Sequence, residues 1–158
     1  MPKIHLTTFI AAPLERVFDL SRNVSMHKIS MEHSGEQAVA GTTSGLINKD
    51  ETVTWKGKHL FKTRLFTSMI TEMKPFEKFT DKMVKGDFRS FEHQHFFKAT
   101  DNGTIVIDII NYETPYGLLG KLVNKFYLKN YLEKLINHRN EVIKEYAVSE
   151  KGKALLGK

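Results

Sequence analysis

The feature that most constrains the fold is a single change in hydrophobic period along the chain. Across residues 35–112, apolar and polar side chains alternate with a period of two, which is typical of half-buried strands. Pro115 and Gly117 end this pattern. From residue 118 to about residue 146, apolar side chains recur at helical spacing, which predicts one helix about 43 Å long. Such a chain has to bury the apolar stripe of this helix against its own sheet.

The residues before residue 35 predict one more strand and two short helices. Residues 3–10 are predicted to be a strand because Ile4, Leu6 and Thr8 share one face. Pro13 is suited to the first turn of a short amphipathic helix, and a second short helix covers residues 24–29. We therefore predict an α+β fold, in which a curved antiparallel β-sheet wraps around a long C-terminal α-helix and two short helices follow the first strand.

A long helix can lie across a sheet only where the sheet curves around it, and this curvature leaves a cavity between them. We expect the cavity to bind a small molecule. Each candidate lining residue is, taken alone, equally compatible with an ordinary core position. The ring-bearing candidates are Trp55, His59, Phe66, Phe79, Phe91, Tyr112, Phe126 and Tyr131.

Two histidines and one aspartate form the candidate polar end of this cavity. His93 and His95 stand two residues apart on a predicted strand, so both imidazoles share one face. Asp108 falls in an otherwise apolar row of the next strand, so its carboxylate needs a partner. Pairing across the hairpin at residues 101–103 brings His95 within diagonal reach of Asp108. A His–Asp pair on the inner face is predicted.

Three interpretations of this cluster remain open from the sequence. The three side chains form a buried polar network, or they recognise a ligand or perform acid–base chemistry, because a histidine pKa lies near neutrality. The third interpretation is a metal site with His59 or Asp108 as a further ligand. A single His-x-His pair is a weak metal motif, so we expect no metal.

Arg139 is the one charged residue that interrupts the apolar stripe of the long helix. One interpretation buries only its aliphatic stem and leaves the guanidinium in water. The other directs the guanidinium into the cavity, where it pairs with Asp108 or with a ligand carboxylate.

Composition excludes several classes of function. The chain has no cysteine, so it has no disulfide, thiolate nucleophile or zinc–cysteine site. Lysine and arginine number 24 against 18 acidic residues, but most stand singly along the strands, and no recognition helix accompanies them. We therefore expect no nucleic-acid partner, and peripheral membrane contact through the basic surface of residues 121–144 is a prediction.

Walker A, G-x-G-x-x-G, G-x-S-x-G and H-E-x-x-H motifs are absent, and we expect no cofactor. With neither an apolar leader nor a membrane-length apolar run, the expected location is cytoplasmic.

Several segments together resemble the SRPBCC group of the START/helix-grip superfamily, which includes the birch-pollen-allergen fold and the polyketide cyclases. More narrowly, they resemble its bacterial branch labelled cyclase/dehydrase-like or cell-division-inhibitor-like. The resemblance spans about residues 3 to 146. It rests on residues 12–19, 53–59, 70–81, 86–88, 91–97, 108–117 and 138–139. One departure is His59-Leu60-Phe61-Lys62, where relatives often have His-Phe-Gly.

The resemblance implies one helix-grip, START-like domain over residues 1–148, with a deep cavity that relatives use for lipids, sterols, hormones and polyketides. Residues 149–158 are predicted to form a flexible tail. The leading hypothesis is a binding or carrier protein for a small, largely apolar ligand of the lipid, polyketide or aromatic class. Two alternatives are a cyclase- or dehydratase-like enzyme that uses His93, His95 and Asp108, and a regulatory module at the membrane or in cell division.

Overall fold

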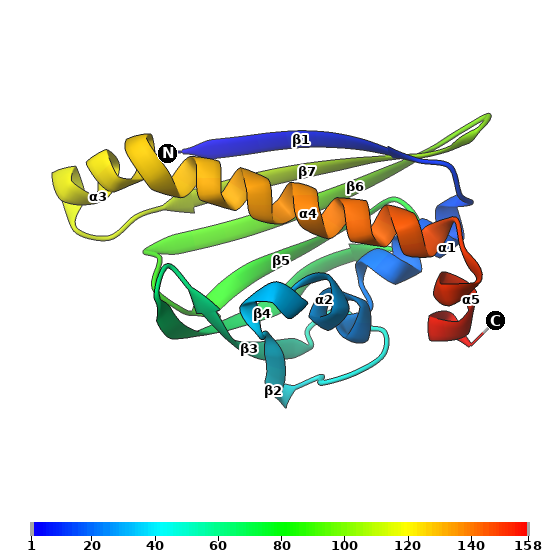
Figure 1. The fold of residues 1–158 in the computed structure, drawn as a ribbon, viewed down its shortest axis with the longest axis horizontal. Coiled ribbons are helices and arrows are strands. Elements are labelled where there is room, and N and C mark those ends of the chain that lie inside the picture. The colour runs from blue at the N-terminus through cyan, green and yellow to red at the C-terminus, as the bar shows by residue number, and fades with distance from the viewer. Residues whose placement is uncertain (1, 158) are drawn as a thin grey trace.

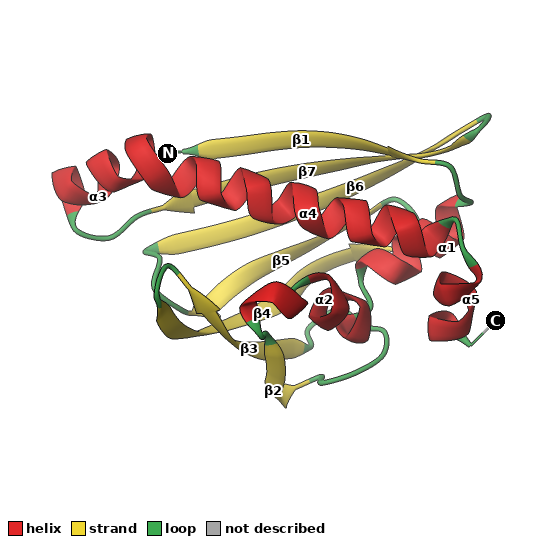
Figure 2. Cartoon of the chain, in the orientation of Figure 1, coloured by secondary structure: helices red, strands yellow, loops and turns green. Residues whose placement is uncertain are grey.

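The computed structural model describes residues 2–157 and contains one seven-stranded antiparallel sheet, in the order β1-β7-β6-β5-β4-β3-β2. Figure 1 shows the long helix α4 lying across this sheet, and Figure 2 separates helices from strands. The strands are β1 (Lys3–Ile10), β2 (Gln37–Gly41), β3 (Thr52–His59), β4 (Lys62–Lys74), β5 (Lys78–Lys85), β6 (Ser90–Thr100) and β7 (Gly103–Glu113). The helices are α1 (Leu14–Ser21), α2 (Val24–Ser30), the 3₁₀ turn η1 (Glu32–Ser34), α3 (Gly117–Val123), the π-helical segment η2 (Asn124–Leu128), α4 (Lys129–Ala147) and α5 (Glu150–Leu156).

The sheet is interrupted by bulges, at which a strand bends. The pairing of β4 with β5 shifts register between Thr67 and Ser68 and again between Ile70 and Glu72. A third shift lies in β2, between Ala38 and Ala40. A bulge increases local twist and bends its strand, which lets the sheet curve around the helix. The predicted α+β fold, with a curved sheet, a long C-terminal helix and two short helices after β1, is confirmed.

Two apolar clusters hold the layers together. The larger one joins α1 and α2 to the sheet and to the last turns of α4, with Phe18 and Ile143 nearly inaccessible to solvent. The smaller one joins β1 and β7 to the first turns of α4, through Ile4, Ile110 and Leu132. Both clusters contribute to the wall of one cavity, so the cavity lies where they meet.

The long helix predicted over residues 118–146 is present, but it contains the π-helical segment η2. Buried or half-buried positions recur every four residues along one side of this helix, at Gly120, Asn124, Leu128, Leu132 and Ile136. Gly120 is required at the start of this row, because a Cβ there would collide with the carbonyl oxygen of Pro115.

The flexible tail predicted from residue 149 is wrong for residues 150–156, which form helix α5. Leu155 and Leu156 pack against the larger apolar cluster. Gly152 is buried against the carbonyl of Tyr146, an approach that a side chain at this position would block. The apolar pair near the C-terminus therefore has a docking place that the sequence pattern did not reveal.

Candidate functional site

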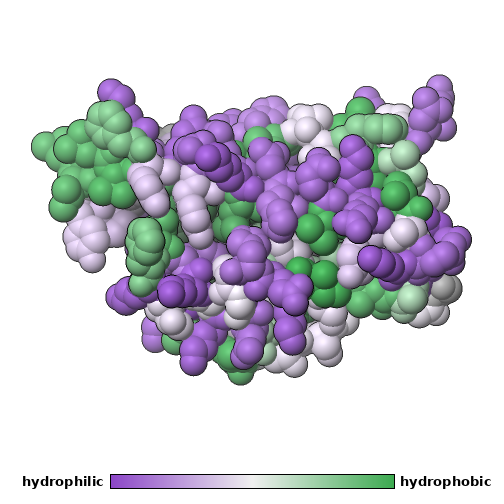
Figure 3. Space-filling view, in the orientation of Figure 1, coloured by the Kyte–Doolittle hydropathy of each residue, from purple (hydrophilic) through white to green (hydrophobic). Residues whose placement is uncertain are grey.

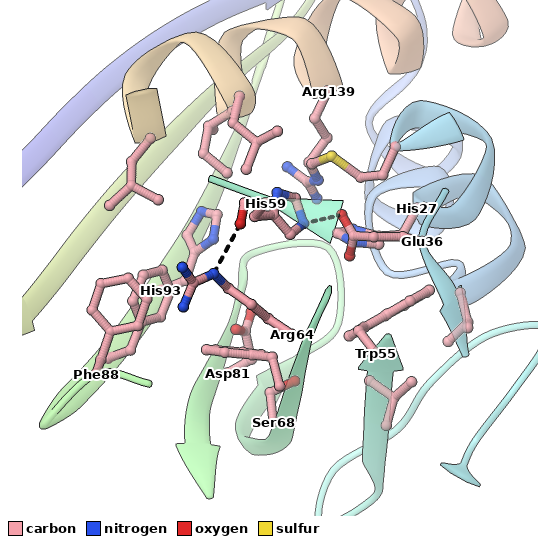
Figure 4. Close-up of a pocket in the computed structure, with 18 of the residues that line it drawn as sticks. His27, Glu36, Trp55, His59, Arg64, Ser68, Asp81, Phe88, His93 and Arg139 are labelled. Atoms are coloured by element: carbon pink, nitrogen blue, oxygen red, sulfur yellow. Dashed lines mark hydrogen bonds and ion pairs between the residues drawn. The ribbon is translucent and has the colours of Figure 1, made fainter. Parts of the chain in front are cut away.

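A cavity of about 340 Å³ lies between the sheet, helix α2 and helix α4. Most of its wall is aliphatic or aromatic. In Figure 4, His93 and Phe88 stand on one side, His27, Glu36 and Trp55 stand on the other, and Arg139 descends from the helix. Leu65 in the wall is more than half exposed, so the cavity reaches the surface.

The structure brings most of the predicted ligand-binding residues to this wall. They are Trp55, His59, Phe66, Phe79, Phe91, His93, His95, Tyr131 and Arg139. Asp108 and Tyr112 lie deeper, fully buried on β7, and Tyr112 donates a hydrogen bond to Asn124.

Phe126 is not a cavity residue, and its prediction as one is wrong. Its side chain is 75% exposed. It stands midway between Asn124 and Leu128, which belong to the inward row of the helix, so it projects from the opposite side. Sequence periodicity could not reveal this, because an apolar residue on a predicted helix is assigned to the core by default.

The predicted His–Asp cluster is present and is larger than expected. His95 pairs directly with Asp108 in the register of β6 and β7. His93 donates from Nε2 to Asp108 Oδ1 at 2.7 Å, and His95 donates from Nε2 to Asp81 Oδ2 at 2.8 Å. The two imidazoles stack with their centroids 3.7 Å apart. Asp81 was not predicted, although it follows Phe79 by two residues on β5 and therefore shares its inward face.

Helix α4 completes this cluster with two adjacent polar residues. Asn140 donates from Nδ2 to Asp108 Oδ2 at 2.7 Å. Arg139 is only 4% exposed, and its Nη1 lies 3.8 Å from Asp108 Oδ1. Its Nη2 donates to the carbonyl of Ser21, at the end of α1. The interpretation that directs this guanidinium inward is therefore the one that the structure supports.

Burial and charge set the protonation of this cluster. Burial, together with the neighbouring His95, lowers the pKa of His93 to about 4, so His93 is neutral near pH 7. Burial alone would raise the pKa of Asp108, but the hydrogen bond from His93 and the approach of His95 hold it well below its usual value. The same opposition, with His95 as the main partner, lowers the pKa of Asp81. Both carboxylates are ionised and Arg139 faces them.

Asp81, His93 and His95 also offer three possible metal-ligand atoms within 4.8 Å of one another. However, the two rings are nearly parallel, at 22°, so their nitrogen lone pairs do not converge on one point. Each Nε2 is already committed to a carboxylate. The geometry suits a hydrogen-bonded network better than a metal centre.

A second polar cluster, around Glu36, stands on the opposite wall. Its carboxylate lies 3.3 Å from His27 Nε2 and 3.2 Å from His59 Nε2. Burial would raise the pKa of Glu36, but the hydrogen bonds from the two histidines lower it to about 2. Burial also raises the pKa of Tyr131, whose hydroxyl lies 2.6 Å from His59 Nδ1. This chain of groups fixes the orientation of the His59 ring beside the cavity.

Glu36 and His27 were not predicted as site residues, because neither belongs to a strand pattern. One signal was available at Gly57, an isolated glycine inside a strand, which often marks a close approach. A Cβ on Gly57 would lie 2.5 Å from Cγ of Glu36, so the glycine makes room for this carboxylate.

No protein-family model matches the chain, and no curated protein matches it in sequence. Solved structures do match over nearly its full length. The protein TTHA0849 from Thermus thermophilus has a TM-score of 0.75 and 19% identity, covering 97% of this chain and 98% of its own. Major latex-like protein 151 from Panax ginseng has a TM-score of 0.70 and 15% identity, covering 94% and 98%. Ara h 8.0201 has a TM-score of 0.68 and 11% identity, covering 93% and 97%.

These similarities define the class by structure: the chain has a helix-grip fold. At these identities the comparison concerns the fold alone. Within residues 2–157, no helix combines the length and the apolar character needed to cross a membrane.

Proposed function

We propose that this protein binds, and thereby carries, a small and largely apolar molecule in the cavity under α4. The observation that carries the proposal is the cavity itself, an apolar space of about 340 Å³ with a polar cluster on each of two walls. Known ligand pockets occupy roughly 300 to 1,000 Å³ and combine apolar walls with a few fixed polar groups.

The charges of the wall indicate what kind of polar group the ligand carries. Three arginines and three carboxylates line the cavity, so it has no strong preference for one sign of charge. Most of its buried charges already face a partner of opposite charge or a histidine. A neutral hydroxyl or carbonyl that accepts a hydrogen bond from an existing donor costs less desolvation than a second charge. We therefore infer an apolar ligand with neutral oxygen groups, in the lipid, polyketide or aromatic class.

Native mass spectrometry of the purified chain, before and after organic extraction, tests the proposal. A retained mass that extraction removes supports it. Binding is then measured by calorimetry with a fatty alcohol and with the dye anilinonaphthalene sulfonate as probes. Leu135→Trp replaces an aliphatic side chain of the cavity wall by a bulkier indole ring and should weaken binding of both probes at least tenfold, about 1.4 kcal/mol.

The matched control is Val148→Trp, which adds the same ring at an exposed position beyond α4. Its binding should equal that of the unchanged protein. If no mass is retained and neither probe binds, or if both variants bind alike, the cavity is not a binding site for such molecules.

A further inference from the structure

The end of the molecule that carries α3 presents an exposed apolar surface. Figure 3 shows apolar side chains gathered over α3 at one end of the molecule. Exposure ranges from 48% at Val123 to 80% at Tyr116. We call this set the α3 patch; its members are Tyr116, Leu118, Leu119, Leu122, Val123, Phe126 and Tyr127. Contiguous apolar groups of this kind mark interaction sites rather than ordinary surface.

The α3 patch is arranged as one face of an amphipathic helix. Leu118, Leu122 and Phe126 form a row at four-residue intervals, and Leu119, Val123 and Tyr127 form the neighbouring row. The lysines 121, 125 and 129 form a third row. Between Glu113 and Glu133 the chain has no acidic residue. The face is therefore apolar with a purely basic border, a pattern typical of helices that lie in a membrane interface.

This charge pattern decides between the occupants that could cover the patch. A second copy of the chain, paired by two-fold symmetry, would place the same surface on both sides of the interface. Lysines would then face lysines, because the border contains no carboxylate to pair with them. An anionic membrane instead provides an apolar interior for the side chains of the patch and negatively charged headgroups for the lysines.

A second exposed apolar residue lies close to the helical segment that carries the α3 patch. Phe61, at the tip of the β3–β4 hairpin, is 90% exposed, with lysines at positions 58 and 62 on either side of it. The hairpin is tied to the helix, because Leu60 packs in the same cluster as Leu128 and the His59 ring contacts the Tyr131 hydroxyl. Both residues that form the tip, Leu60 and Phe61, adopt left-handed backbone angles, so the turn holds Phe61 outward at some cost in strain.

We propose that the α3 patch and the Phe61 tip form a docking surface for anionic membranes. The apolar side chains enter the headgroup boundary, and lysines 121, 125 and 129 contact anionic headgroups. The docking surface acts whether or not the cavity holds a ligand.

Vesicle flotation of the full chain tests this proposal. Vesicles of phosphatidylcholine mixed with phosphatidylglycerol should bind the protein, and vesicles of phosphatidylcholine alone should bind it much more weakly. Binding should fall as salt rises, because the headgroup contacts are screened. The double variant Leu122→Ser/Phe126→Ser should lose roughly tenfold or more of its vesicle binding. Its matched control is Val84→Ser/Val148→Ser, which removes two other exposed apolar side chains.

Charge is tested separately. Lys121→Gln/Lys125→Gln/Lys129→Gln should abolish the preference for phosphatidylglycerol. Lys49→Gln/Lys74→Gln/Lys98→Gln removes the same net charge elsewhere on the exposed surface and should keep it. Circular dichroism checks that each variant is folded. Failure to bind anionic vesicles, or equal binding by the apolar variant and its control, overturns the proposal. Self-association that Leu122→Ser/Phe126→Ser removes, without vesicle binding, would also overturn it and assign the patch to a second copy.

Discussion

Asp108→Asn tests whether the buried cluster under α4 stabilises the fold. The substitution keeps the shape of the side chain but removes its charge at a position with 0% exposure. It leaves Arg139 buried without its 3.8 Å partner. His93 and Asn140 each donate to a different oxygen of Asp108 at 2.7 Å, so the NH2 group of the new amide has to face one of these two donors. Removing one partner of a buried ion pair costs about 3 to 5 kcal/mol, and we expect Asp108→Asn to lower the free energy of unfolding by that amount.

Urea unfolding, followed by the fluorescence of the single tryptophan, Trp55, measures this loss. In a domain of this size it corresponds to a decrease in Tm of about 6 to 20 °C. Because the folded pKa of Asp108 lies well below its ordinary value of 3.8, its contribution is present above that value and is lost as pH falls through the folded pKa. The difference between the two proteins should therefore be constant from pH 8 to pH 5.

Asp101→Asn is the control, since Asp101 is exposed in the β6–β7 turn and its loss should change stability by about 0.5 kcal/mol or less. A cost below about 1 kcal/mol for Asp108→Asn would refute the reasoning. The charges of the cluster would then not compensate one another in the folded protein.

Three further predictions concern the same two clusters. The folded pKa of His93 is about 4 against an ordinary 6.5, so the unfolded chain binds a proton at a higher pH than the folded protein does. The free energy of unfolding should therefore fall by about 3 kcal/mol between pH 6.5 and pH 4. Urea titrations across this range should show a weaker dependence of the unfolding free energy on pH for His93→Gln. Glu36→Gln should lower the free energy of unfolding by about 3 kcal/mol at pH 7 and should remove the loss of stability that Glu36 causes between pH 4.5 and pH 2. If the variant loses stability over this pH range as the unchanged protein does, the hydrogen bonds from His27 and His59 do not set the pKa of Glu36. Gly57→Ala should lower Tm because its Cβ collides with Glu36, and the effect should shrink in a Glu36→Ala background; equal losses in both backgrounds would locate the strain elsewhere.

Much of the fold could be predicted from the period of the apolar side chains. The alternation of apolar and polar side chains predicted the five strands from β3 to β7, because a half-buried strand has to present one apolar face. The same alternation put His93 and His95 on one face, and the short hairpin at residues 101–103 brought Asp108 opposite them. These are local relations, which the spacing along the chain determines.

The parts that the sequence did not reveal depend on contacts between distant residues. Glu36 reaches His59 only because η1 ends beside a glycine of β3. Residues 150–156 form a helix rather than a tail because α1 and α4 offer their apolar residues a place to pack.

By itself, therefore, the sequence determined the layers of this protein, the helix that crosses its sheet and the face on which the His–Asp pair lies. Those features follow from backbone periodicity, which acts over a few residues. Only the tertiary structure decided that Phe126 projects outward, that Arg139 turns inward and that Glu36 stands across the cavity from His93. Such choices depend on which surfaces meet when the helix docks on the curved sheet. Whether a side chain is buried at that contact is decided by residues more than a hundred positions apart, as in the hydrogen bond from Asn140 to Thr8.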